Sequence, residues 1–193
     1  MVLSKTDKLL KSPEVDPHKY SQLNYDKEAM AKWAKAITDE YPKFNIVGET
    51  WLSTPGHISA WQKDSKTGEA AGYNSNLPSV MDFVLFSEMP KALKEKESWD
   101  KGMIKLYDAF TSDFLYPDIN NLLVFFENHD TERWNEIFNA DPKAYKMGLT
   151  LISTVRGIPQ IYYGSEIGMR GNKTKGGDAD IRRDFPGGWK SDK

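Results

Sequence analysis

Residues 122–130 read LLVFFENHD, and this segment says more about the fold than any other part of the chain. Its opening run of apolar residues predicts a buried strand. The polar group Asn128-His129-Asp130 follows at the carboxyl end of that strand. In α/β barrels, catalytic groups lie at the carboxyl ends of the strands. The segment therefore indicates a strand that delivers polar side chains to a functional edge.

A second segment repeats this pattern earlier in the chain. Residues 44–47 are mostly apolar and lead into Gly48-Glu49-Thr50-Trp51. Two predicted strand ends thus present a carboxylate each, Glu49 and Asp130. Most glycosidases cleave their substrate with a pair of carboxylates that flank the scissile bond. A glycosidase is therefore one hypothesis for the function.

Length and composition exclude several classes of protein. The 193 residues correspond to one domain, or to a piece of a larger one. A formal net charge of -2, without an arginine-rich motif, argues against a nucleic-acid partner. The absence of cysteine excludes disulfides and thiolate metal sites, and the histidines, which lie far apart, form no local zinc motif. No cofactor is therefore evident.

Hydropathy gives no sign of a membrane partner. No apolar stretch is long enough to span a bilayer, and residues 1–8 are too polar for a signal peptide. For the chain as written we expect a cytoplasmic location. A longer parent with an upstream signal would instead be periplasmic or secreted.

Apolar periodicity predicts alternating helices and strands after an irregular N-terminal arm at residues 1–24. The remainder, residues 25–193, is expected to form one unit. Alternation of this kind implies parallel strands and right-handed crossovers, and four strands are half of an eight-stranded barrel. The expected segments are strands at 44–49, 81–86, 122–126 and 157–164, helices at 26–41, around 103–110 and from 141, and loops at 52–78 and 170–193.

Each candidate site residue also has an ordinary structural interpretation. Glu49 beside Trp51 fits a solvated strand-end glutamate next to a core tryptophan at least as well as a general acid beside an aromatic platform. Asn128-His129-Asp130 fits a helix-capping loop as well as a catalytic cluster. Glu127 and Arg133 are interpreted as a surface ion pair, Tyr163 as rim packing and residues 178–183 as a solvated loop.

Taken together, the segments resemble the α-amylase family of glycoside hydrolases. Residues 48–51 look like the end of the family's fifth barrel strand, residues 126–130 like the end of the seventh, and residues 157–166 like the eighth-strand segment. Residues 178–189 resemble the neopullulanase and cyclomaltodextrinase branch. The resemblance implies a partial TIM (β/α)8 barrel, roughly strands 5 to 8 with their helices, across residues 25–193.

The resemblance also implies roles for individual residues in the cleavage of α-1,4-linked glucans or maltooligosaccharides. Glu49 would be the general acid/base and Asp130 the stabiliser of the transition state. His129 would bind the sugar at the cleavage subsite, and Trp51 would line the leaving-group side. Asn128 and Tyr163 are further candidates for substrate binding.

One part of the family pattern is missing from this sequence. The family's nucleophile is an aspartate in a Gly-x-Arg-x-Asp pattern that should precede the first predicted helix. Residues 13–24 read PEVDPHKYSQLN and contain neither an apolar strand nor Arg-x-Asp. The resemblance further implies that the family's calcium sites lie mostly in parts absent here, and the sequence has no Asp-rich calcium loop.

Three hypotheses follow for the chain as a separate molecule. The first is a fragment of a retaining glycosidase that is inactive alone because its nucleophile is missing. The second is a non-catalytic module that holds oligosaccharide with its aromatic side chains. The third is a poorly folded fragment whose open sheet edges favour self-association.

Overall fold

The computed structural model describes residues 27–188 and residue 190. The predicted arm at residues 1–24 lies outside the described residues and stays a prediction. The α-helices are α2 (Lys27–Glu40), α3 (Pro55–Ser59), α4 (Lys66–Ala70), α5 (Phe83–Lys94), α6 (Ile104–Thr111), α7 (Trp134–Ile137), α8 (Pro142–Thr154) and α9 (Lys173–Ile181). Single 3-10 turns are η2 (Asp113–Leu115), η3 (Ile119–Asn121) and η4 (Ser165–Ile167).

Four short parallel strands run side by side in chain order. They are β1 (Val47–Gly48), β2 (Ser79–Val80), β3 (Leu123–Phe125) and β4 (Ile158–Gln160). In the register, Val47 pairs with Ser79 and Leu123 with Ile158. A parallel bridge between Met81 and Leu123 joins the two pairs. The parallel arrangement predicted from helix–strand alternation is thus confirmed.

The outer strands leave apolar side chains exposed. Within the described residues, β1 and β4 each pair along one edge only. Val47 on β1 and Ile158 on β4 are both exposed to solvent. Unpaired, apolar edges are surfaces on which another strand can add. Self-association through these edges stays a prediction.

The predicted strand at residues 81–86 is wrong, because a helix begins there. Asp82 is buried, and its carboxylate caps α5 by accepting a hydrogen bond from the Leu85 amide (2.9 Å). An ion pair with Arg156 (2.5 Å) further fixes that carboxylate. A short apolar run fits a buried helix start as well as a strand, and periodicity alone does not separate the two.

The other corrections concern segments expected to be loops. The helices α3 and α4 lie within residues 52–78, and α9 lies within the expected C-terminal loop. α9 is kinked at Gly177, whose φ of 66° lies in the left-handed region. The helices predicted at 26–41, around 103–110 and from 141 are confirmed as α2, α6 and α8. As expected, Asp141 caps α8, and its carboxylate accepts a hydrogen bond from the Lys143 amide (2.9 Å).

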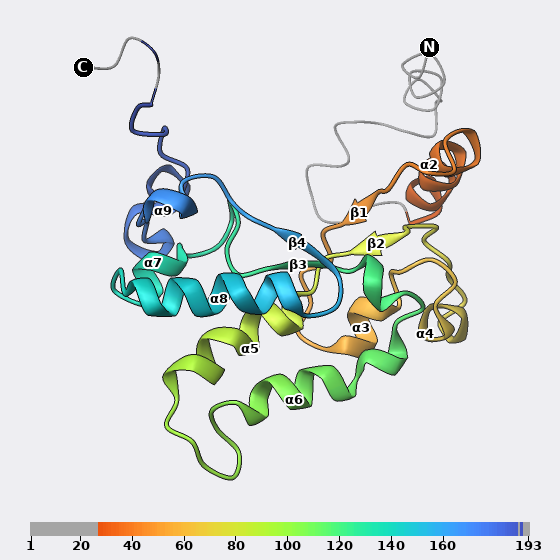
Figure 1. Cartoon of the computed structure of the whole chain (residues 1–193). Helices are drawn as coiled ribbons and strands as arrows, with labels where there is room; N and C mark the ends of the chain where they lie inside the picture. Colours follow the sequence, from red (N-terminus) through yellow and green to blue (C-terminus); the bar gives the residue numbers. More distant parts are fainter. Residues whose placement is uncertain (1–26, 189, 191–193) are drawn as a thin grey trace.

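The main core lies between the strands and the helices that follow them. The helices α5, α6 and α8 lie on the same side of β3 and β4 (Figure 1). Their apolar faces pack against buried side chains of β3, including Val124 and Phe125. Packing from this side holds the strands in place, so that the loops at their carboxyl ends start from fixed positions. Across the described residues, no helix combines the length and the apolar character needed to cross a membrane.

Candidate active site

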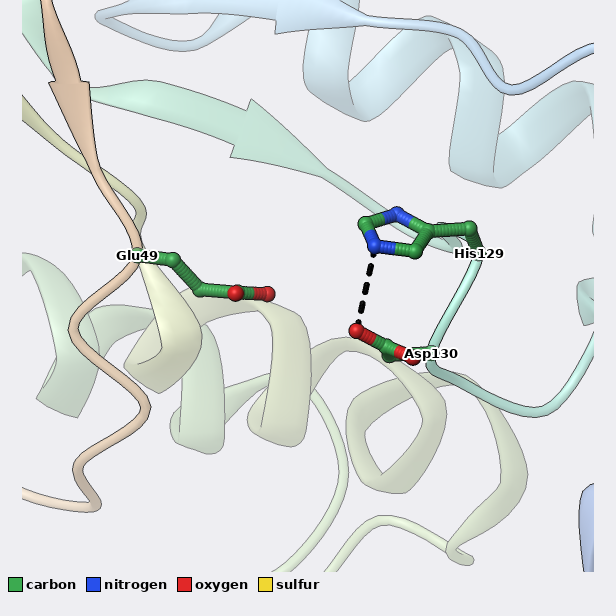
Figure 2. Close-up of side chains that lie close together, drawn as sticks. All are labelled: Glu49, His129 and Asp130. Atoms are coloured by element: carbon green, nitrogen blue, oxygen red, sulfur yellow. Dashed lines mark ion pairs between the residues drawn. The ribbon is translucent and has the colours of Figure 1, made fainter. Parts of the chain in front are cut away.

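Two strand ends bring together residues that are far apart in the sequence. Glu49 directly follows β1, whereas His129 and Asp130 lie in the loop after β3. The Glu49 side chain points toward His129 and Asp130, across the gap between the end of β1 and the loop after β3 (Figure 2). One carboxylate oxygen of Glu49, one of Asp130 and one ring nitrogen of His129 all lie within 4.8 Å of one another. The expected meeting of the two carboxylates is therefore present.

Local hydrogen bonds fix the loop that carries His129 and Asp130. The Asn128 amide nitrogen donates to Thr131 Oγ1 (2.8 Å), and the Asp130 amide nitrogen donates to Asn128 Oδ1 (2.8 Å). His129 Nε2 lies 3.1 Å from Asp130 Oδ2. The loop thus combines a local Asx turn at Asn128 with a carboxylate directed toward Glu49. It does not cap the next helix as the alternative interpretation expected, because the N-cap of α7 is Arg133 and makes no side-chain cap hydrogen bond.

The guanidinium group of Arg182, from the C-terminal segment, lies against the Asp130 carboxylate oxygen that His129 does not contact. Arg182 Nη2 donates to Asp130 Oδ1, and Arg182 Nε donates to the carbonyl oxygen of His129 (2.8 Å). Lys173 Nζ lies 3.6 Å from the same Asp130 oxygen. Interpreting residues 178–183 as a solvated loop missed these contacts. The alternating charges were the available signal, but a charge pattern does not specify a partner in another segment.

Beneath the loop lies a buried ion pair between Glu127 and Arg133. Its interpretation as a surface pair is wrong, because both side chains are essentially inaccessible to solvent. Arg133 donates to the carbonyl oxygens of Tyr163 (2.7 Å) and Ile181 (3.0 Å). Glu127 accepts hydrogen bonds from Ser165 Oγ and the Trp134 amide. The pair thus ties the segment after β3 to those after β4 and α9.

Burial dominates the protonation equilibrium of Glu127. Desolvation raises the pKa of this carboxyl group above its ordinary value. Hydrogen bonds from Ser165 and Trp134, and the charge of Arg133, act in the opposite direction and are the weaker influence. Glu127 is therefore a buried structural group with donors on several sides.

The structure places the remaining candidate site residues in different environments. Trp51 is half exposed and stacks on Phe83 with ring centroids 4.7 Å apart, so it is not a core tryptophan. Tyr163 is partly exposed, and its hydroxyl donates to the Arg183 carbonyl oxygen (2.6 Å). Asn128 is buried under its own loop. Their roles in substrate binding stay predictions.

The described residues contain one group of side chains with the composition of a metal site, Glu49 with His129 and Asp130. Calcium takes six to eight oxygen ligands in proteins. Three donors, of which one is an imidazole nitrogen, do not fit that requirement. Calcium binding elsewhere in the chain stays a prediction.

Comparison with known proteins gives consistent matches. The family model described as the α-amylase catalytic domain matches residues 1–192. An α-amylase of Niallia circulans is 25% identical over 158 residues, which is 82% of this chain and 27% of that protein. A cyclomaltodextrin glucanotransferase of Geobacillus stearothermophilus is 27% identical over 144 residues, 72% of this chain and 19% of that protein.

Solved structures agree with these matches. The α-amylase of Geobacillus thermoleovorans, determined in complex with acarbose, superposes with a TM-score of 0.66 at 25% identity, over 83% of this chain and 34% of that chain. An Anoxybacillus α-amylase gives the same TM-score and identity, over 83% and 33%. The predicted partial (β/α)8 barrel is thereby confirmed. The chain spans between about a fifth and a third of the length of these relatives.

Proposed function

Because this chain belongs to the α-amylase family of glycoside hydrolases, we propose that it carries part of the active site of a retaining enzyme that cleaves α-1,4-glucosidic bonds. The substrates are starch-like glucans or maltooligosaccharides. We further propose that the chain corresponds to the C-terminal half of the barrel, and that by itself it holds such a glucan without cleaving it.

The meeting of Glu49 and Asp130 is the observation that supports this proposal most strongly. Their carboxylate oxygens lie within 4.8 Å of one another, although the two residues come from different strand ends. Two carboxylates this close can act on the same glycosidic bond, one as an acid and the other on the charge that develops on the sugar. The retaining class is proposed from the family, because the spacing that distinguishes retaining from inverting enzymes is measured to a nucleophile or base, and Asp130 is neither.

The contacts of each residue support a distinct role. Glu49, which faces the gap, would protonate the glycosidic oxygen. Asp130, held by His129 and Arg182, would stabilise positive charge that develops on the sugar. The exposed ring of Trp51 offers an aromatic face to a sugar ring.

The lack of a nucleophile supports the absence of turnover by the chain alone. Residues 13–24 hold no Arg-x-Asp, where the family pattern would place the nucleophilic aspartate. Loss of a covalent nucleophile removes most of the rate of an enzyme that depends on it. Binding by an aromatic platform and a carboxylate does not depend on that residue.

Titration of the purified chain with maltoheptaose, followed by tryptophan fluorescence, tests this proposal. We expect a saturable change that Trp51→Phe abolishes and that Trp99→Phe leaves intact, because Trp99 is almost fully exposed and lies in another segment. Prolonged incubation should release no new reducing ends. A chain without any saturable signal would contradict glucan binding. Turnover that Glu49→Gln removes would contradict the expected inactivity.

A further inference from the structure

Glu49, His129 and Asp130 form a mixed set of donors that transition metals prefer over calcium. One imidazole nitrogen and two carboxylate oxygens match the ligand types of zinc sites. We propose that these three residues bind a zinc-like divalent cation, and that the bound cation and a glucan exclude one another. The metal site itself is independent of the proposed function, and only the exclusion rests on it.

The distance between His129 and Asp130 already suits a shared metal ion. His129 Nε2 and Asp130 Oδ2 are 3.1 Å apart. Two ligand atoms that each lie about 2.0–2.2 Å from one zinc ion, at near-tetrahedral angles, are separated by roughly 3.1–3.6 Å. A cation placed between these two atoms would therefore replace their present contact without a change in the backbone.

Glu49 can complete the set by a movement of its side chain alone. Within the described part of the chain, no hydrogen bond or ion pair engages its carboxylate. The group is exposed and lies on the opposite side of the gap from His129. The ligand atoms of the three residues now lie within 4.8 Å of one another. Rotation about the side-chain torsions of Glu49 can bring its carboxylate oxygen closer to the other two, to the distance that separates two ligands of one metal ion. Nothing that Glu49 now binds has to be broken.

The positively charged side chains near the site do not occupy the oxygen atom of Asp130 that would bind the metal ion. Arg182 engages Asp130 through Oδ1, so Oδ2 stays available on the side of His129. Lys173 makes its shorter ion pair with Asp178 (2.8 Å) and only a longer one with Asp130. Both cations near Asp130 thus lie on its Oδ1 side, and the Oδ2 side, which faces His129 and Glu49, carries the two carboxylates. Three protein ligands leave a fourth position open, as in zinc sites that accept water or substrate.

Zinc titration of the tag-free chain by calorimetry, paired with the absorption spectrum of the cobalt-substituted form, tests the site. We expect one zinc ion per chain, with an affinity that falls at least about tenfold in His129→Ala and in Glu49→Gln. His57→Ala is the matched control, because this histidine lies in α3 and outside the donor group. Its affinity should equal that of the unchanged protein.

Two results would overturn the metal site. One is that the wild-type protein binds zinc no more tightly than His129→Ala does. The other is a cobalt spectrum unchanged by His129→Ala in a variant whose circular dichroism shows it is folded. Since Glu49→Gln replaces the carboxylate by an amide of the same shape, it keeps the test valid if His129→Ala does not fold.

A competition experiment tests the exclusion separately. Saturating zinc should weaken binding of acarbose at least about tenfold, because the cation occupies the carboxylates that face the sugar. Unchanged acarbose affinity would overturn the exclusion while the zinc titration still decides the metal site. A chain that binds zinc but never acarbose would contradict the proposed function and the exclusion, and would leave the metal site standing.

Discussion

Replacement of Arg133 by methionine is expected to lower the free energy of unfolding by about 3–5 kcal/mol. Methionine keeps much of the buried volume but removes the charge that faces Glu127 and the donors to Tyr163 and Ile181. Glu127 would then be a buried carboxylate without its cationic partner. Urea unfolding followed by circular dichroism measures the change.

The free energy of unfolding that Arg133→Met loses should increase with pH. Burial already raises the pKa of Glu127, so its contribution to stability is present at acidic pH and is lost as the pH rises through the folded-state pKa. Removing Arg133 removes an influence that lowers this pKa. The difference in free energy of unfolding between wild type and Arg133→Met should therefore increase from pH 5 to pH 8.

Two further variants separate the buried charge from other effects. Arg133→Met combined with Glu127→Gln should be more stable at pH 8 than Arg133→Met alone, since no unpaired charge remains. Arg170→Met is the control, because its ion pair with Glu136 is partly exposed and such pairs contribute about 1 kcal/mol or less. Equal losses for Arg133→Met and Arg170→Met would contradict the buried network.

Replacement of Trp134 by alanine is expected to cost about 3–5 kcal/mol of stability. The ring is fully buried, and it packs against Phe126 and Phe138 with centroid distances of 5.1 Å and 4.6 Å. Its Nε1 donates to the Ala144 carbonyl oxygen (3.0 Å). A β-carbon at Gly148 would lie 2.8 Å from the ring, so the two surfaces are closely fitted. Truncation would leave a large cavity and would remove the hydrogen bond to the Ala144 carbonyl oxygen.

Trp99→Ala is the matched control for this prediction. That tryptophan is 97% exposed, so its removal should change the unfolding free energy by no more than about 0.5 kcal/mol. Thermal and urea unfolding of both variants measure the difference. A loss below about 1 kcal/mol in Trp134→Ala would show that its pocket is not rigidly packed.

The sequence predicted best those elements whose signals are local. Asp141 followed by Pro142 specifies a helix start within a few residues, and α8 begins there. The run 122–126 lies between turn-forming residues, and β3 forms within it. The two carboxylates were found because a strand end fixes the place of the residue that follows it. These predictions required no knowledge of distant partners.

The parts that sequence reasoning missed depend on partners from distant segments. Arg133 is buried because Glu127 and carbonyl oxygens from two later segments surround it, and no local pattern shows that environment. Arg182 reaches Asp130 only because Ile181 is anchored in the core beside Arg133. In the same way, Asp82 starts a helix where apolar residues alone suggested a strand.

Binding of acarbose, measured by calorimetry on the wild type, Asp130→Asn and Asp39→Asn, tests the proposed sugar site most directly. Acarbose carries an amine that is cationic when protonated, and Asp130 is the carboxylate proposed to face positive charge. We predict that the wild type binds acarbose and that Asp130→Asn binds it at least about tenfold more weakly, a loss of about 1.4 kcal/mol. Asp39→Asn, on the exposed face of α2, should bind like the wild type. Equal affinity in Asp130→Asn, or no binding by the wild type, would contradict the assignment of this site.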